Sequence, residues 1–237
     1  AGYDVNTHAI PAGEKYKNLK TIETLWNAFL DAGLDRSSTV IALGGGVVGD
    51  LTGFAASTYM RGIDWINLPT TLLAMVDASV GGKTGIDLPQ GKNLVGAFHS
   101  PKMVIIDPEA LSTLPEHEMR SGMAEVVKHS VIDSPDLFEL CKSGISANPT
   151  AFEDLIIEAI SVKVKVLQED PYEKGKRAVL NFGHTIGHAI ELVSNFTIPH
   201  GNAVAIGMMM ESRLAHQIGM VNSSFITDLE KTLSALN

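Results

Sequence analysis

Apolar and polar positions follow two different periods over the first half of the chain. Residues 39–43 form a short apolar, β-branched run that leads into glycines, and residues 65–68 and 103–106 form two more, each bounded by Pro or Asp. Residues 21–33 instead carry apolar side chains at helical spacing and stop at a glycine, as helices commonly do. Strands that alternate with helices predict βαβ units around a parallel sheet.

The pattern becomes helical after Pro115, and no strand candidate of similar quality follows. We therefore predict an α/β nucleotide-binding domain over residues 1–110 and an all-α domain over residues 111–237, with the boundary within residues 107–115. Turn signals such as Asn148-Pro149 and Pro199-His200-Gly201 separate the predicted helices, which cover residues 116–132, 151–169, 178–194 and 203–219.

Composition and charge exclude several classes of protein. The chain has 237 residues, enough for one large domain or two modest ones with real cores. Its net charge of −9 argues against a nucleic-acid partner, because phosphate binding normally requires a basic face. The single cysteine, Cys141, excludes an internal disulfide framework and suits the reducing cytoplasm. No apolar run approaches the roughly 20 residues that span a bilayer, so no membrane segment is expected.

A glycine-rich turn follows the first predicted strand. Gly44, Gly46 and Gly49 form a G-x-G-x-x-G pattern that opens a predicted helix. Glycines at this position let backbone N–H groups approach a pyrophosphate, and the helix N-terminus adds partial positive charge. The alternative is a tight βα turn without a ligand, and the pattern alone does not decide between them.

Two further glycine-rich segments carry lysines. Lys83 follows Gly81-Gly82, and Lys92 and Asn93 follow Gly91, although the Walker spacing is missing. Two lysines and an asparagine on glycine-rich loops would suit a phosphate dianion, since each donor adds a charge-assisted hydrogen bond. Solvated loop lysines are the alternative, and the clustering favours phosphate binding.

Three histidines and one glutamate are candidate metal ligands. His184 and His188 stand at i and i+4, on one helix face, and His200 follows a proline. Glu125 lies among apolar neighbours, where a carboxylate must be paired or metal-bound. Glu125 with two histidines would form a His₂Glu set with an open position for a substrate. The alternatives are a buried salt bridge between Glu125 and Lys128 or an arginine, and histidines that serve in the core, in a cap or beside a ligand. Spacing does not select two of the three imidazoles.

These segments together resemble the 3-dehydroquinate synthase family almost from end to end. That family has an N-terminal Rossmann-like nucleotide-binding domain and a helical metal- and substrate-binding domain, with the active site in the cleft between them. The resemblance implies a lyase of the shikimate pathway of aromatic amino-acid biosynthesis. Such an enzyme converts a sugar phosphate, 3-deoxy-D-arabino-heptulosonate 7-phosphate, to 3-dehydroquinate with catalytic NAD and a divalent metal, usually zinc, with cobalt an alternative. The matching segments are residues 44–54, 69–74, 80–85, 91–94, 123–128 and 180–189.

The resemblance also assigns residue roles. It implies that Glu125, His184 and His200 bind the metal, which moves His188 to the substrate phosphate. Arg61 would reach the phosphate from a neighbouring subunit, which implies a homodimer. The other implied substrate contacts are Lys83, Asn93 and Asn181 at the phosphate, Lys163 and Arg177 at a carboxylate, Asp77 and Lys128 at ring hydroxyls, and Lys92 and Glu173 nearby. The implied NAD contacts are Glu14, Lys17, Gly45, Gly46, Asp50, Thr70, Thr71, Thr113 and again Lys83 and Lys92.

The chain departs from the family at both ends. The family has strands before the position of residue 1, with an acidic residue at the ribose, and helices after the position of residue 237, with a lysine near the phosphate. We therefore expect pieces to be missing from both ends, and we expect the 237-residue chain alone to bind NAD poorly or to be inactive.

Three other functions are compatible with the same residues. A related sugar-phosphate cyclase is the nearest, but Lys163, Arg177 and Asn181 favour a substrate with a carboxylate, because a neutral sugar would leave buried cations unpaired. A metal-dependent polyol dehydrogenase would release NADH. A non-catalytic nucleotide-binding protein would not need an intact Glu125, His184 and His200 set.

Overall fold

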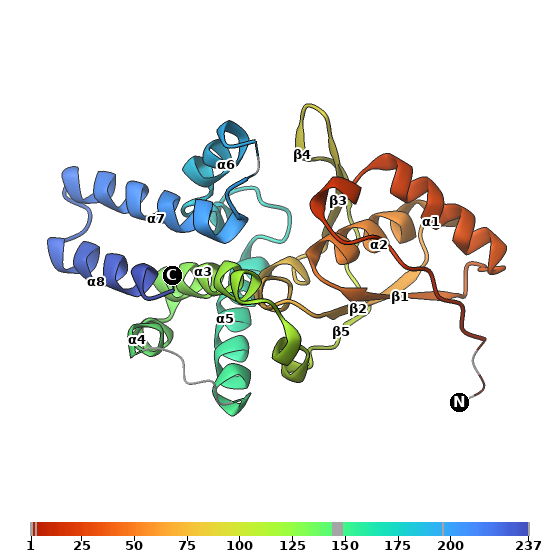
Figure 1. Cartoon of the computed structure of the whole chain (residues 1–237), viewed down its shortest axis with the longest axis horizontal. Coiled ribbons are helices and arrows are strands. Elements are labelled where there is room, and N and C mark those ends of the chain that lie inside the picture. Colours follow the sequence, from red (N-terminus) through yellow and green to blue (C-terminus); the bar gives the residue numbers. More distant parts are fainter. Residues whose placement is uncertain (1, 3, 144–148, 196, 237) are drawn as a thin grey trace. The chain divides into compact units, whose positions relative to one another are not determined.

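The computed structural model describes residues 2, 4–143, 149–195 and 197–236. These residues form two compact units (Figure 1). The first comprises Ala1–Thr70 with Ala78–Asp107, and the second comprises Thr71–Asp77 with Pro108–Asn237. The short segment Thr71–Asp77 lies within the predicted domain of residues 1–110, but it packs with the second unit.

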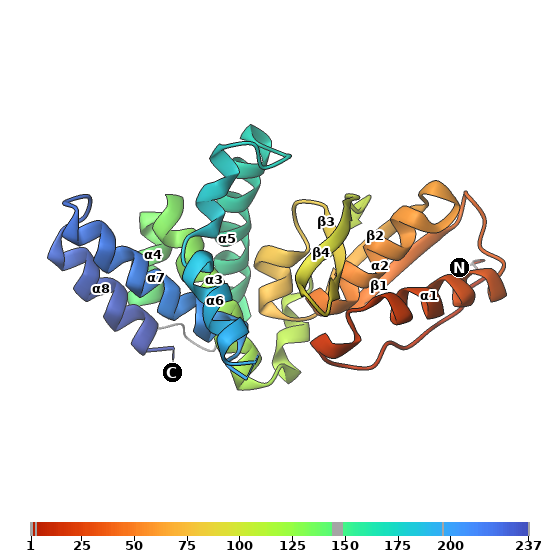
Figure 2. The same ribbon diagram turned by 90° about the horizontal axis from the view of Figure 1, so that it is seen from above.

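The first unit contains the predicted βαβ arrangement. Strands β1 (Thr39–Gly44) and β2 (Asp64–Pro69) are parallel neighbours joined through helix α2 (Gly46–Thr58). The short strand β5 (Met103–Val104) adds to β2, which gives the parallel order β1-β2-β5. Helix α1 (Leu19–Asp31) packs beside α2 (Figure 2). The parallel sheet is confirmed, while the third strand ends before the expected residue 106.

One face of this sheet packs on the helices. Ile22 and Leu25 of α1, Leu51 and Phe54 of α2 and Trp65 of β2 belong to one buried cluster. Side chains of a strand alternate between faces, so the neighbours of buried Ala42 lie on the opposite face of β1. These neighbours, Ile41 and Leu43, are 61% and 67% exposed.

The glycine-rich segments around Lys83 and Lys92 are not loops. They form an antiparallel hairpin of β3 (Lys83–Leu88) and β4 (Gly91–Phe98). Lys83 begins β3, and Lys92 and Asn93 lie on β4, so the predicted pair of phosphate-binding loops is wrong as local structure. The physical reason is that Thr84 and Ile86 are buried β-branched residues, which a strand accommodates better than a loop.

All regular elements in the described residues of the second unit are helical, as the sequence predicts. Helices α3, α5 and α7 cover the expected segments, whereas α4 and α8 were not expected. Both helices begin after an N-cap residue that the sequence could have indicated. The Ser134 hydroxyl accepts from Leu137 N–H, and the Asn222 side chain accepts from Phe225 N–H. The elements are η3 (Ala74–Ala78, of which the last residue belongs to the first unit), η4 (Pro108–Thr113), α3 (Glu116–Asp133), α4 (Pro135–Ser143), α5 (Pro149–Glu169), η5 (Lys176–Asn181), α6 (His184–Val193), α7 (His200–Gln217) and α8 (Ser223–Ser234).

The helices also decide two expectations from composition, on membrane segments and on the single cysteine. No helix in the described part of the chain combines the length and apolar character needed to cross a membrane. Cys141 of α4 is buried, and this burial raises the pKa of its thiol to about 12.

Helix α3 lies at the centre of the second unit. It contacts α4, α5 and α7, and every residue from 121 to 130 is buried. Glu125, Lys128 and His129 fall within this stretch. Burying charged groups is unfavourable unless they are paired or coordinate a metal, so the position of these side chains requires polar partners inside the helical unit.

The predicted helix over residues 178–194 is wrong as one element. It is divided into η5 and α6 at Phe182 and Gly183. Gly183 adopts a left-handed φ of 78°, and its N–H donates to the Glu211 carboxylate of α7 at 2.8 Å. Gly207 of α7 packs against the same point, where an added methyl group would lie 1.9 Å from the Gly183 carbonyl oxygen. These contacts fix the start of α6, and thus His184, against α7.

We expect Gly207→Ala to disturb this helix pair. The new methyl group would overlap backbone that cannot rotate away, so we predict a loss of about 1–3 kcal/mol in the free energy of unfolding, measured by urea denaturation. Asn202→Ala, at an exposed position of the same helix, is the matched control and should change stability by less than about 0.5 kcal/mol. Equal stability of the two variants would contradict the close packing.

Candidate active site

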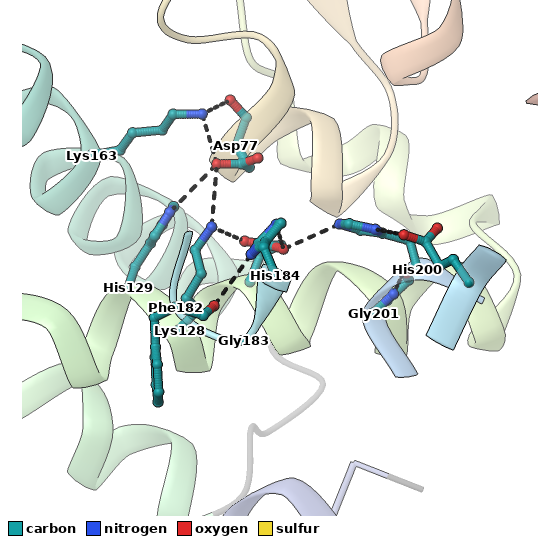
Figure 3. Close-up of polar contacts among 12 residues, drawn as sticks. Asp77, Lys128, His129, Lys163, Phe182, Gly183, His184, His200 and Gly201 are labelled. Carbon is teal, nitrogen blue, oxygen red and sulfur yellow. Dashed lines mark hydrogen bonds and ion pairs between the residues drawn. The ribbon is translucent and has the colours of Figure 1, made fainter. Parts of the chain in front are cut away.

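Three predicted metal ligands converge in the second unit. Glu125 comes from the middle of α3, while His184 and His200 are the first residues of α6 and α7. Glu125 Oε1 lies 3.4 Å from Nε2 of His184 and 3.4 Å from Nε2 of His200. One potential ligand atom from each of the three residues lies within 4.8 Å of the others. Figure 3 shows His184 and His200 directed toward this point.

The other ring nitrogens indicate how both imidazoles are oriented. His184 Nδ1 lies 3.2 Å from the Phe182 carbonyl oxygen, and His200 Nδ1 lies 3.4 Å from Glu191 Oε2. Because a carbonyl and a carboxylate only accept, each Nδ1 carries the donated proton. Both Nε2 atoms face Glu125 Oε1, so with both rings neutral a cation could bind among these three atoms. Such outer partners commonly fix the tautomer of histidine metal ligands.

His188 is adjacent to this set without belonging to it. Its ring centroid lies 5.2 Å from that of His184 and 6.1 Å from that of His200, and the residue is exposed. Two other groupings of ligand atoms share members with the set, namely His188 with Glu191 and His200, and Asp77 with Glu125 and His129. The first set alone joins Glu125 to two imidazoles.

Glu125 is fully buried and also pairs with Lys128 through Oε2. The salt bridge and the histidine contacts, which were alternatives in the sequence, thus use different oxygens of one carboxylate. Burial raises the pKa of Glu125, but the attraction of Lys128 outweighs it and the net pKa falls below its usual range. The carboxylate is therefore ionised at neutral pH.

The two imidazoles differ in their protonation. Burial lowers the pKa of His184 to about 4, so its ring is neutral at neutral pH. Burial also acts to lower the pKa of His200, but hydrogen bonds to Glu125 and Glu191 outweigh it and raise that pKa to about 9. A divalent cation must therefore displace a proton from His200 to bind.

A second group of charges surrounds Asp77. Lys163 Nζ donates to the Asp77 carboxylate at 2.6 Å and to its backbone carbonyl at 2.5 Å. Lys128 Nζ and His129 Nε2 lie 3.9 Å and 3.6 Å from the same Oδ1 atom (Figure 3). Burial acts to raise the pKa of Asp77. The positive charges of Lys163 and Lys128 outweigh this effect, and the net pKa falls well below the usual value. Burial lowers the pKa of Lys163.

The segment after α5, which is held by hydrogen bonds to Asp170, contains three further predicted residues. Asp170 accepts backbone hydrogen bonds from Lys174, Gly175 and Arg177 at 2.7–3.0 Å. The buried Arg177 donates from Nη1 to the Pro171 carbonyl oxygen at 2.7 Å. The Asn181 amide donates to Glu173 Oε1 at 3.2 Å. These hydrogen bonds therefore fix the backbone positions from which the Arg177 and Asn181 side chains extend.

The first unit carries most of the predicted nucleotide residues, while Thr71 and Thr113 belong to the second. Gly45 is the N-cap of α2 and Gly46 its first residue, so the G-x-G-x-x-G turn opens a helix as predicted. The buried Lys17 lies with Nζ 2.5 Å from Asp50 Oδ2 and 2.5 Å from the Asn93 side-chain oxygen, and 4.0 Å from Glu14 Oε1. Lys17 thus connects residues that the resemblance divides between NAD and the substrate phosphate.

The other predicted residues lie on separate elements, and their roles remain predictions. Thr70 N–H donates to the Gly44 carbonyl oxygen at 2.9 Å, and the Thr71 hydroxyl accepts from Ala74 N–H at 3.2 Å. Arg61 ends the turn η2 (Tyr59–Arg61) with a left-handed φ of 72°. Lys83 and Lys92 lie on the hairpin, and Thr113 ends η4.

Sequence reasoning missed Glu191 and Asp170 and left His129 without a role. Glu191 stands three positions after His188, so a carboxylate on the same face of α6 was readable from the sequence. Its pairing with His200 was not, because that contact depends on how α7 packs on α6. Asp170 follows the end of α5 and gave no motif of its own.

Comparison with known families supports the resemblance seen in the sequence. The family model described as 3-dehydroquinate synthase N-terminal matches residues 7–121, and the one described as 3-dehydroquinate synthase C-terminal matches residues 122–237. A 3-dehydroquinate synthase of Picosynechococcus sp. is 51% identical over 227 residues, which cover 93% of this chain and 62% of that protein. One of Synechocystis sp. is 49% identical over 231 residues, with 94% and 64% covered. The chain thus spans 62–64% of the length of these relatives.

Solved structures share the fold. A 2-deoxy-scyllo-inosose synthase complexed with carbaglucose-6-phosphate, NAD+ and Co2+ superposes with a TM-score of 0.88 at 36% identity, covering 94% of this chain and 63% of that one. A 2-epi-5-epi-valiolone synthase from Streptomyces hygroscopicus with NAD+ and Zn2+ bound gives 0.91 at 32% identity, covering 96% and 65%. A sulfoacetaldehyde reductase at 16% identity and a TM-score of 0.67 shows the fold alone.

We expect Glu191→Gln to weaken zinc binding. The amide would no longer hold the Nδ1 proton of His200 by a charge-assisted bond, and loss of an outer partner typically reduces metal affinity about 10–100-fold. Competition with a chromogenic chelator measures this affinity. Glu230→Gln, which removes a carboxylate exposed on α8, is the control. Unchanged affinity in Glu191→Gln, with retained helical circular dichroism, would show that Glu191 does not orient His200.

Zinc affinity should also rise with pH. Because the pKa of His200 is about 9 and that of His184 about 4, one proton leaves for each ion bound between these values. The binding constant should therefore increase about tenfold per pH unit from about pH 6 to about pH 8 and level off above the pKa of His200. Calorimetry in buffers of different ionisation enthalpy counts the released proton. A binding constant independent of pH would refute this assignment.

Proposed function

The chain belongs to the 3-dehydroquinate synthase family, and we propose that it performs that family's reaction. This is the conversion of 3-deoxy-D-arabino-heptulosonate 7-phosphate to 3-dehydroquinate and phosphate with catalytic NAD and a divalent metal, in the shikimate pathway. The convergence of Glu125 Oε1 with Nε2 of His184 and His200 carries this proposal. Since the chain spans only 62–64% of its relatives' length, the activity is assigned to the protein as a whole.

The donor set fits the proposed metal. One carboxylate and two neutral imidazole nitrogens are ligands that zinc accepts while it retains an open position, and cobalt accepts them as well. When bound, a divalent cation would polarise a substrate hydroxyl and lower its pKa. Glu125 supplies the negative charge, and the backbone of Phe182 and the Glu191 carboxylate keep the two rings turned toward it.

The first unit supplies the proposed nucleotide contacts. The amide groups at the start of α2, at Gly45 and Gly46, suit a pyrophosphate because a helix N-terminus carries partial positive charge. NAD would supply reversible hydride transfer, so the cofactor is restored in each cycle. Lys17 and Asp50 form an ion pair beside this turn and offer one donor and one acceptor to the nucleotide.

The remaining charged residues would orient an anionic substrate. Lys128 and Lys163 are buried cations held at Asp77, and Arg177 is held by its loop. Fixed charges of this kind would hold the substrate carboxylate and ring hydroxyls in place without reorganising during the reaction. Holding one substrate conformation also favours the intramolecular ring closure that follows.

Buried cations favour a substrate that bears a carboxylate. Lys163 and Arg177 are buried, and a sugar phosphate that lacks a carboxylate would bring no second anionic group to these two cations. The identities agree with this choice, because the chain is 49–51% identical to 3-dehydroquinate synthases but 32–36% identical to the two sugar-phosphate cyclases of known structure. A cytoplasmic location and a homodimer, in which Arg61 serves the neighbouring subunit, complete the proposal.

The reaction itself distinguishes the proposal from the dehydrogenase alternative. With the heptulosonate phosphate, NAD and zinc, we expect phosphate release without accumulation of NADH, because the hydride returns to the substrate. A coupled phosphate assay and absorbance at the NADH band measure the two products together. Chelation should abolish phosphate release, and added zinc should restore it.

Two outcomes would contradict the proposal. Steady accumulation of NADH would indicate a dehydrogenase. Release of phosphate from a sugar phosphate that lacks a carboxylate, at a rate equal to that from the heptulosonate phosphate, would indicate a related cyclase.

A further inference from the structure

His129 is a buried imidazole without a role in the site described so far. It is fully buried in α3, and within the described residues neither ring nitrogen makes a hydrogen bond. A buried polar group that lacks a partner is unfavourable, and native proteins contain few. Asp77 Oδ1 lies 3.6 Å from its Nε2. We propose that His129 is a positioning residue that holds the Asp77 carboxylate in the orientation used by the proposed reaction.

The geometry around Asp77 supports this role. Lys128 and His129 are consecutive on α3, and Lys163 comes from α5, so two helices direct three nitrogen atoms at one oxygen. Lys163 makes the short contact at 2.6 Å, while Lys128 is shared with Glu125. Figure 3 shows His129, Lys128 and Lys163 reaching Asp77 from different directions, so the planar ring can limit the rotation of the carboxylate.

A neutral ring is suited to this position. Two ammonium groups already face Asp77, and a third cation would be repelled by them. Burial lowers the pKa of His129, so the ring stays uncharged and can donate one hydrogen bond from Nε2 without adding charge. The side chain of Asp77 remains 25% exposed. Its contacts with the two lysines and His129 are at Oδ1, so part of the carboxylate stays accessible. This inference rests on the proposed function, in which Asp77 faces the substrate.

The tautomer of His129 tests the contact without requiring turnover. In ¹⁵N NMR spectra of the folded chain we expect a neutral ring with the proton on Nε2, and a shift of that resonance in Asp77→Asn. A proton on Nδ1, or a resonance that does not respond to Asp77→Asn, would overturn the proposal. This measurement decides the contact even if the protein releases no phosphate, an outcome that would count against the proposed function alone.

Kinetics of variants test the consequence. His129→Phe retains the volume of the ring without a donor, and we expect kcat to fall about tenfold with KM changed less than about twofold. His129→Gln places an amide donor near Nε2 and should recover most of the loss. His117→Phe, at an exposed position of the same helix, is the matched control and should leave kcat unchanged.

Combination with Asp77→Asn separates positioning from a general structural effect. If His129 acts through Asp77, adding His129→Phe to Asp77→Asn should reduce kcat by less than about twofold. Independent, multiplying losses in the double variant would overturn the proposal, as would equal impairment of His129→Phe and His129→Gln. Thermal unfolding and bound zinc, measured for each variant, ensure that only folded and metal-loaded protein enters the comparison.

Discussion

The site in the second unit depends on how α3 keeps charges inside a helical core. Ionised side chains are unfavourable there unless each finds a partner of opposite sign or a strong hydrogen bond. Glu125 finds Lys128 through one oxygen and the two histidines through the other, and Lys128 lies between Glu125 and Asp77. Removal of one member would therefore leave an uncompensated charge in the interior. The same pairing keeps both carboxylates ionised, which is the state that metal and substrate binding require.

Backbone packing sets the distances among these charges. His184 and His200 begin two different helices, so their separation depends on how α6 and α7 approach each other. The close contact of Gly207 with Gly183 determines that approach, and Glu211 holds the first turn of α6 by accepting from Gly183 N–H. The ligand geometry is thus a property of the helix pair as well as of the ligands themselves.

Periodicity predicted most of the elements but could not predict contacts between distant segments. The strands at residues 39–43 and 65–68 and most long helices follow from local patterns, because a buried strand or an amphipathic helix records its environment in its own residues. The break at Gly183 depends on Glu211, 28 positions away, and local helical spacing extends across it. The hairpin at Lys83 was obscured because its glycines also fit a phosphate loop.

The site, like the fold, was predicted where local sequence patterns or the family resemblance identified residues, and not where a residue's partner lies on a distant segment. Spacing favoured His184 with His188, which are neighbours on one helix, and it left the choice open. The resemblance singled out Glu125, His184 and His200, whose ligand atoms do converge. His129 and Glu191 could not be placed, because their partners Asp77 and His200 come from other elements.

The lone thiol of Cys141 gives this molecule an internal reporter. Its side chain is buried in α4, and its raised pKa keeps it almost entirely in the unreactive protonated form. An alkylating reagent can reach the sulfur only when α4 separates from its neighbours. The labelling rate at low reagent concentration therefore follows the equilibrium of local opening in the helical unit, and the chain has no second cysteine to complicate the reading.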